Sequence, residues 1–250
     1  MRRRFLTQKK SMDNEFDYLN YFTIECLEDG RIRTINTDIL YGVDGKGWGV
    51  LPSELEVKKG QLISLKSYKE YFEYFSLVNC NIRGNSLSLV FGDASSTNND
   101  LTGKHSVFHN LLVNNPIHQV DPLFLPATTL TDDCYYEMFR GCSSLTTAPE
   151  LPATTLAYYC YAYMFQGCTS LTVAPELPAT ALASGCYNSM FMGCSNLNYI
   201  KMLATDIPTP DCLYNWVYGV SPTGTFVKRK GVEIPRGVNG IPEGWDVIEI

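Results

Sequence analysis

The sequence predicts an α/β solenoid of stacked 26-residue coils, each with a short strand and a short helix, behind a small antiparallel β-domain. Three observations support this fold class: an internal repeat of 26 residues, an apolar pattern inside each repeat that fits a short helix, and alternating apolar and polar runs ahead of the repeats. The chain has 250 residues, which is enough for one or two domains with a substantial core.

The repeat is the strongest of these signals. Three ungapped copies at 125–150, 151–176 and 177–202 read LPATTLTDDCYYEMFRGCSSLTTAPE, LPATTLAYYCYAYMFQGCTSLTVAPE and LPATALASGCYNSMFMGCSNLNYIKM. The first two agree at 18 of 26 positions. Decayed copies stand at both ends, so the repeats are assigned to 94–223. A 26-residue period is typical of leucine-rich repeats and is too short for propeller blades or helical hairpins.

Each repeat contains a candidate helix. In the first full copy, one buried face at about 100° per residue would hold Cys134, Tyr135, Met138, Phe139 and Cys142. Thr-Asp-Asp ahead of this face supplies N-cap oxygens, and a glycine near its end favours a stop. A short extended run, Leu-Thr-Thr, follows and ends at a proline, which has no amide to donate. Such a coil can bury its apolar face only by stacking on its neighbours.

Seven of the nine cysteines fall on two columns one period apart: Cys134, Cys160, Cys186 and Cys212, and then Cys142, Cys168 and Cys194. Two cysteines eight residues apart on one helical face would lie about 12 Å apart, beyond disulfide reach. No CxxC pair is present to start a zinc site. We therefore expect free, packed thiols in preference to disulfides within a coil or a metal site.

The flanking segments differ in character from the repeats. Residues 17–93 alternate in short runs separated by Asp-Gly and Lys-Gly turns, which predicts a β-sandwich-like domain. Within it, 87–91 is expected to be a strand and the aromatic cluster at 68–75 is expected to be core. Residues 224–250 contain two further apolar runs that predict a C-terminal β cap.

Residues 1–16, which begin MRRRF, are predicted to be a disordered basic tail. A secretory signal would need an apolar run of about 7–15 residues there, and none follows. No stretch approaches the roughly 20 apolar residues that cross a bilayer, so we expect no membrane insertion. The net charge of −6 is opposite to that of most nucleic-acid binders, so no nucleic-acid partner is expected.

Few residues offer catalytic chemistry. His105 and His109 have the spacing of helical metal ligands, but neither His118 nor an acidic residue completes a motif, and no GxSxG nucleophile is present. The acidic pair Asp132 and Asp133 is absent from the following copies. We therefore expect no enzyme activity, no cofactor and no metal.

Tyrosines mark the candidate binding surface. Residues 125–202 hold only 7 charged residues in 78, and Thr, Ser, Ala and Tyr take their place. Four tyrosines lie off the predicted buried face: Tyr136, Tyr158, Tyr159 and Tyr163. Exposed tyrosines among small hydroxyl residues suit a protein or sugar partner. The alternative is that these rings only pack over neighbouring coils.

The repeat unit LPATTL…CY..MF.GC.SLT.APE resembles that of the BspA-type leucine-rich-repeat surface proteins of Bacteroidetes and their relatives in gut phages. The IRGNSLSLVFGD stretch, the LNYIKMLATDI exit and the GTFVKRKGVEIPRGVNGIPEGWDV tail also look like parts of that architecture. The resemblance implies a right-handed leucine-rich-repeat solenoid without catalysis, used for adhesion or recognition on a cell surface or a virion. It supplies no residue-level binding motif.

These observations lead to three hypotheses about function. The first is a non-catalytic adhesion or recognition protein that binds a protein or glycan on a cell surface through its repeats. The second is a structural or decorating component of a phage virion or similar particle, docked through the N-terminal β-domain. The third is an enzyme whose site is not visible in the sequence.

Overall fold

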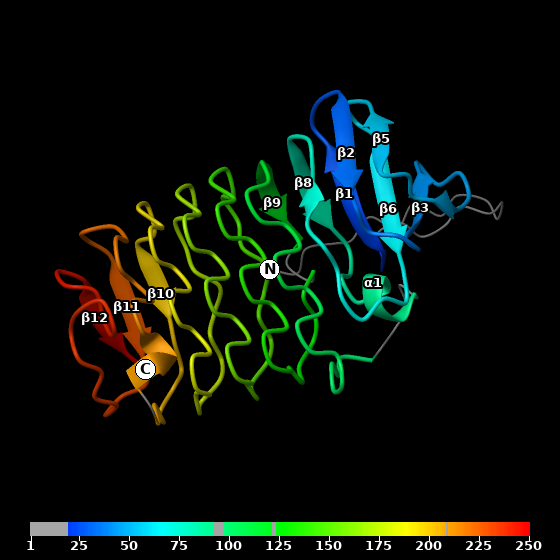
Figure 1. Cartoon of the computed structure of the whole chain (residues 1–250). Helices are drawn as coiled ribbons and strands as arrows, with labels where there is room; N and C mark the ends of the chain where they lie inside the picture. The colour runs from blue at the N-terminus through cyan, green and yellow to red at the C-terminus, as the bar shows by residue number, and fades with distance from the viewer. Residues whose placement is uncertain (1–19, 93–97, 122–123, 209) are drawn as a thin grey trace, which may run out of the picture.

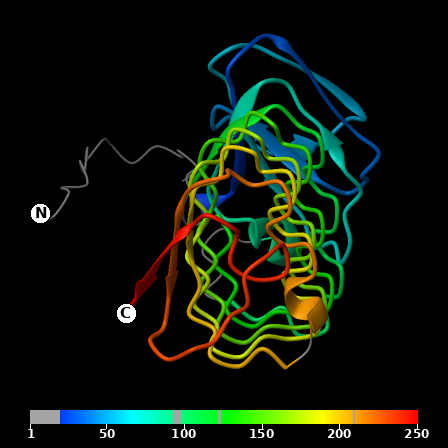
Figure 2. The same cartoon turned by 90° about the vertical axis from the view of Figure 1, so that its left-hand side faces the viewer.

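The computed structural model describes residues 20–92, 98–121, 124–208 and 210–250. It is an elongated body in which loops of chain lie side by side between the N-terminal sheets and the C-terminal strands (Figure 1). Viewed from the C-terminal end, successive loops nest on one another (Figure 2). The stacked repeats, residues 98–223, are termed the repeat stack. The predicted tail at 1–16 lies outside the described residues.

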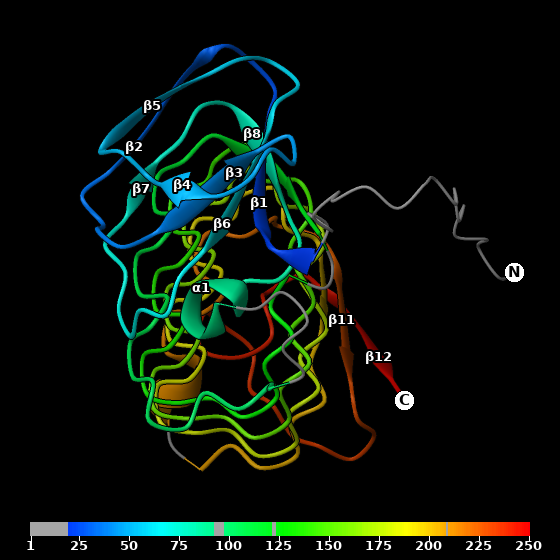
Figure 3. The ribbon, with the colours of Figure 1, turned by 90° about the vertical axis from the view of Figure 1, so that its right-hand side faces the viewer.

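The first sheet has the strand order β4-β3-β6-β1-β8-β9 and lies at the N-terminal end of the nested loops (Figure 3). Its strands are β1 (Phe22–Cys26), β3 (Leu40–Val43), β4 (Gly49–Val50), β6 (Leu62–Lys66), β8 (Cys80–Arg83) and β9 (Ile117–Val120). All pairs are antiparallel except β8 with β9. Because β9 belongs to the first decayed repeat, this sheet continues across the domain boundary predicted at residue 93.

A second, smaller sheet has the order β5-β2-β7. Its strands are β2 (Gly30–Thr34), β5 (Glu54–Val57) and β7 (Phe75–Ser76). β2 alternates in the way a half-buried strand requires: Ile32 is buried, and Arg33 is exposed and pairs with Glu54 across the strands at 2.6 Å. The sequence pattern predicted this alternation.

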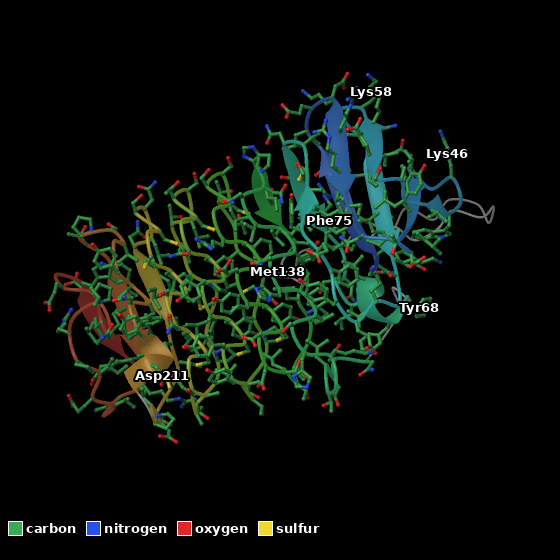
Figure 4. The ribbon with its side chains drawn as sticks, viewed as in Figure 1. Lys46, Lys58, Tyr68, Phe75, Met138 and Asp211 are labelled. Atoms are coloured by element: carbon green, nitrogen blue, oxygen red, sulfur yellow. The ribbon has the colours of Figure 1, made fainter. Side chains whose placement is uncertain are left out.

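Two local expectations for the N-terminal part were wrong. The segment 87–91 is not a strand, because it contains the α-helix α1 (Ser88–Phe91), which ends where Gly92 takes a left-handed φ of 69°. The aromatic cluster at 68–75 is core only in part. Its two phenylalanines are buried, but its tyrosines are exposed, and Tyr68 points outward beside α1 (Figure 4).

Each repeat has a turn segment where a helix was predicted, residues 131–142 in the first full copy. Alternate amides in it donate to the carbonyl three residues back, as from Cys134 to Thr131 at 3.3 Å. The amides between them donate to the next repeat, as from Tyr135 to the carbonyl of Cys160 at 3.0 Å. Half of the amides therefore hold the turns, and the other half join one repeat to the next.

Backbone conformation explains why these segments are not helices. In the first full copy every fourth residue has a positive φ: Asp133 (55°), Glu137 (56°) and Gly141 (72°). An α-helix needs a φ near −63° at every position. Burial repeats with the same four-residue period, because two residues point inward and the next two point outward. Over nine residues, that pattern fits a helical period of 3.6 almost as well.

The predicted α/β leucine-rich-repeat solenoid is therefore wrong. The described residues form three β-sheets, and their helices are α1 and the 3-10 helix η2 (Pro210–Leu213). The leucine-rich-repeat assignment, drawn from the period and from the family resemblance, is wrong for the same reason. In the described parts of the chain, no helix is long and apolar enough to cross a membrane.

Two columns of aromatic rings run through the interior of the repeat stack. One contains Phe72, Phe108, Tyr135, Tyr161 and Tyr187, and the other contains Phe22, Phe124, Phe139, Phe165 and Phe191. The rings stack nearly parallel throughout the first column and from Phe139 onward in the second, where Phe139 and Phe165 have centroids 5.6 Å apart and planes at 2°. Phe124 is tilted by 59° against both of its neighbours in the second column. Both columns end on Trp216. They make one continuous core from the N-terminal sheets to the C-terminal strands.

All nine cysteines are buried thiols that form no disulfide, which confirms the prediction of packed thiols. One cysteine column also joins the repeats through hydrogen bonds. The thiols of Cys142, Cys168 and Cys194 donate to carbonyls of the preceding repeat at 3.0, 3.1 and 2.9 Å. A small buried donor is required at this position of every full copy.

We expect these thiols to be unreactive in the folded protein. Burial raises the pKa of Cys142, Cys160 and Cys194 to about 12, so almost no thiolate exists near pH 8. Ellman's reagent should modify all nine cysteines in guanidinium and none in the native state on the same time scale. The folded pKa lies above the unfolded one, so this contribution to stability is complete below about pH 9 and is lost towards pH 12. Rapid reaction of several native thiols would contradict the described burial.

The C-terminal segment continues the stack with parallel strands. β11 (Thr225–Lys228) pairs with β10 (Tyr199–Lys201) of the last full repeat, and β12 (Asp246–Glu249) pairs with β11. Trp245 is buried beside them and donates its indole N–H to the carbonyl of Ser221 at 2.7 Å. These strands occupy the place of the predicted C-terminal cap at 224–250.

Candidate functional site

The four predicted tyrosines lie together on the outer side of two neighbouring turn segments. Tyr158 and Tyr159 have ring centroids 4.5 Å apart, and Tyr136 lies 5.3 Å from Tyr163 and 6.4 Å from Tyr159. Tyr158 is 52% exposed and the other three are partly buried. The four residues are termed the tyrosine patch. That they bind a ligand stays a prediction.

The four-residue period of the turn segments explains why the tyrosine patch lies on the outer side of the repeat stack. Tyr135 and Tyr161 point inward and join an aromatic column, so Tyr136, one residue later, points outward. Tyr159 and Tyr163 stand at the left-handed positions, with φ of 51° and 57°. Tyrosine rarely adopts this conformation. It is held here because their amides donate to carbonyls of the next repeat at 3.2 and 2.8 Å.

A glycine in the next repeat sets the position of the Tyr159 ring. Gly185 stands one period after Tyr159, with a φ of 63°, and a Cβ atom built on it would overlap the ring. The ring therefore lies directly over the glycine. Among the three full copies, only the one at 177–202 has a glycine at this position. An aromatic ring can therefore lie over the backbone in this way only at the edge of the patch that faces that copy.

His109 extends the patch on the other side. Its ring meets the ring of Tyr136 edge to face, with centroids 4.7 Å apart. Sequence reasoning considered His109 as a metal ligand, set that aside, and took it as a surface histidine without placing it beside the tyrosines. The sequence spacing could have predicted that His109 lies beside Tyr136. His109 lies 27 residues before Tyr136, and the offset between these two repeats is 26 or 27 residues.

Charges near the patch are few and largely compensated. Asp132 accepts the amide N–H of Tyr158 at 3.1 Å, and Glu137 pairs with Arg140 at 3.0 Å. Burial raises the pKa of the Asp133 carboxyl above its usual value. Burial, with a smaller effect of Glu137, raises the pKa of Tyr136 to about 12. The phenol of Tyr136 is thus neutral at physiological pH and can donate or accept a hydrogen bond.

The rings form a platform and not a cage. An aromatic cage holds a cation between faces that stand apart. Here the centroids of neighbouring rings lie only 4.5 to 6.4 Å apart, so each ring packs against the next. Such a platform can stack on a flat or apolar ligand face and hydrogen bond through its phenols.

Sequence reasoning missed two further exposed tyrosines. Tyr214 and Tyr218 are 51% and 58% exposed in the turn segment of the last repeat. The repeat at 203–223 has lost most of the repeat motif, so its outward-facing positions were not recognised in the sequence. The repeat spacing could have identified Tyr214 as an outward-facing residue, because it lies three periods after Tyr136.

The described residues gather no group of three or more His, Cys, Asp or Glu side chains that could hold a metal ion. The expectations of no enzyme activity and no cofactor stay predictions. No family model, no curated protein and no solved structure matches the chain.

Proposed function

We propose that the protein is a non-catalytic adhesion or recognition protein that binds a protein or glycan on a cell surface through the tyrosine patch. The observation that carries this proposal is the row of four tyrosines on the outer side of the repeat stack, in which each ring lies beside the next. Tyrosine is enriched at binding surfaces because it offers a large contact area and a hydrogen-bonding group at low conformational cost.

Two features support the proposal. The outer positions of the turn segments are rich in Tyr, Asn, Ser and Gly, the composition of antibody binding loops. Their backbone is fixed by hydrogen bonds between repeats, so binding would order few groups. The likeness of the repeat motif to BspA-type surface proteins is in line with adhesion.

A second candidate function is a component of a phage virion or similar particle, docked through the N-terminal sheets. It is favoured by exposed apolar side chains in that part of the chain. Ile35 is 72% exposed and Tyr68 is 75% exposed, and Tyr74 lies beside Ile35 in the lining of a shallow groove. Single exposed apolar residues are normal, but a group of them marks a contact surface.

The test is binding of the fluorescently labelled full chain to intact gut bacteria and epithelial cells by flow cytometry. The patch variant carries Tyr158→Ser and Tyr163→Asn, because asparagine tolerates the left-handed backbone of residue 163. Loss of two central contact tyrosines should weaken binding by about tenfold or more. Circular dichroism of both proteins checks that the fold is unchanged.

A matched control carries Tyr68→Ser and Tyr74→Asn, which removes two exposed tyrosines from the N-terminal part. We expect it to bind like the parent protein. Equal loss in both variants, or undiminished binding of the patch variant, would refute the tyrosine patch as the site. Absence of saturable binding to any cell would contradict adhesion and favour the particle component.

A further inference from the structure

Parallel backbone bridges join neighbouring repeats along the stack, and one row of these bridges is interrupted between two full copies. Gln119 is bridged to Thr147, and Val173 is bridged to Tyr199 at the start of β10. Thr147 and Val173 are equivalent residues of the two most similar repeats, yet among the described residues no bridge joins them. This row of bridges is therefore open between the copies at 125–150 and 151–176, which a bridge from Thr129 to Thr155 joins at another position.

Prolines stand at matching positions directly after the interruption. Both copies continue with Ala-Pro-Glu-Leu-Pro, so Pro149 faces Pro175 and Pro152 faces Pro178. Proline has no amide to donate, so prolines in register cannot extend the pairing past residues 148 and 174. The next repeat has lysine and alanine in place of these prolines, and there the pairing resumes with a bridge from Leu177 to Met202.

A groove occupies the gap in this row of bridges. Its volume is about 360 Å³, and it is lined by Ala148, Pro149, Glu150, Leu151, Pro152, Pro175, Glu176 and Pro178. Four proline rings make its walls mainly apolar, and the two glutamates are exposed. The zigzag turn segments run along one side of the nested loops and β11, the partner of β10, along the other (Figure 2). The groove follows the bridge positions on the β10 side, away from the tyrosine patch.

Two backbone amides at the groove differ in hydrogen bonding from their equivalents in the next repeat. In the following repeat, the amides of Ala174 and Leu177 donate to carbonyls of residues 199 and 201 at 3.0 Å. The equivalent amides of Ala148 and Leu151 make no hydrogen bond to any described residue. A ligand carbonyl that reaches one of these amides would gain a hydrogen bond.

One carboxylate at the groove is also unpaired. Glu176 pairs with Lys201 of the next repeat at 2.9 Å. The residue that corresponds to Lys201 beside Glu150 is Pro175, and among the described residues no base pairs with Glu150. The net charge of −6 adds to the attraction for a cation.

We propose that this groove binds an extended, basic peptide segment of a partner protein. The aliphatic stem of a lysine or arginine would lie along the proline walls, with its charged head on Glu150. The peptide carbonyls would accept from the amides of Ala148 and Leu151. The peptide fits better than a free amine because it supplies both carbonyls and an apolar stem.

The probe is a fluorescein-labelled peptide, Gly-Pro-Arg-Pro-Leu-Gly, titrated with the full chain and followed by fluorescence anisotropy. The same peptide with glutamine in place of arginine is the control ligand. We expect Glu150→Gln to weaken binding up to about fivefold, the range of a partly exposed ion pair, and Glu150→Lys to weaken it further. Higher salt should weaken binding of the arginine peptide only.

Changes in the amide chemical shifts of the protein on peptide addition locate the binding site. Perturbation centred on Ala148 and Leu151 supports the groove, and Glu233→Gln, an exposed acid elsewhere, should leave the affinity unchanged. Equal affinity for both peptides, no saturable binding, or no effect of Glu150→Lys would overturn the proposal. Loss of peptide binding in the Tyr158→Ser and Tyr163→Asn variant would move the site to the tyrosine patch and equally overturn it. Failure of cell binding alone leaves the groove unaffected, because the two sites use different residues.

Discussion

Replacement of Trp216 by alanine should lower the free energy of unfolding by about 3–5 kcal/mol. Trp216 is fully buried and closes both aromatic columns, with ring centroids 6.4 Å from Tyr187 and 6.1 Å from Phe191. Its indole N–H donates to the carbonyl of Gly240 at 2.8 Å, which holds the C-terminal segment against the stack. Alanine would leave a large cavity and an unpaired buried carbonyl at the same place.

Chemical denaturation followed by circular dichroism measures this effect. The matched control is Tyr218→Ala, which removes an aromatic ring two residues away that is 58% exposed. We expect the control to change the free energy of unfolding by no more than about 0.5 kcal/mol. Similar values for the two variants would show that Trp216 does not close the core.

A valine at Gly167 should destabilise the protein by about 1–3 kcal/mol. Gly167 has a φ of 74°, and a β-branched residue is a genuine outlier in that region. Space is not the reason, because a Cβ atom there would lie 3.7 Å from Cα of Gly141, an ordinary contact. The cost comes from the backbone conformation, which the hydrogen bond from the Gly167 amide to the carbonyl of Met192 at 2.8 Å holds in place.

The control for Gly167→Val is Thr172→Val, an exposed position in the same repeat whose φ is not positive. It introduces the same side chain without the conformational cost, so we expect a change within about 0.5 kcal/mol. A neutral or stabilising Gly167→Val would contradict the left-handed conformation at this position.

The sequence predicted the repeat, its buried positions and several strands. The apolar runs at 22–26, 31–35 and 61–65 correspond to β1, β2 and β6 within one residue. The turn segments were predicted as helices because a four-residue period and a 3.6-residue period bury the same residues over two turns. Gly141 and its equivalents were a warning, but they also fit a helix stop.

Local preference could not have revealed the left-handed tyrosines. Tyr159 and Tyr163 stand where a propensity argument would place glycine or asparagine. Hydrogen bonds to the next repeat impose that conformation, and these contacts are about 25 residues away in sequence. The candidate site was predicted better, because a residue off the buried face points outward in a helix and in a turn segment alike. The packing of its rings into one platform depends on neighbouring repeats and could not be predicted.

The most direct test of the turn-segment architecture is the difference in the free energy of unfolding between Glu137→Gly and Glu137→Ala, because residue 137 has a φ of 56° and lies in the middle of the segment predicted as a helix. Both variants lose the ion pair with Arg140, so the difference between them reports the backbone conformation, and the two conformations predict opposite signs. In a left-handed turn alanine carries a Cβ penalty, so we expect the glycine variant to be more stable by about 1–2 kcal/mol. In a helix the alanine variant would be more stable by roughly 0.5–1 kcal/mol, because glycine loses more conformational freedom on folding. A more stable glycine variant supports stacked turns joined by alternate amides, and a more stable alanine variant would contradict them.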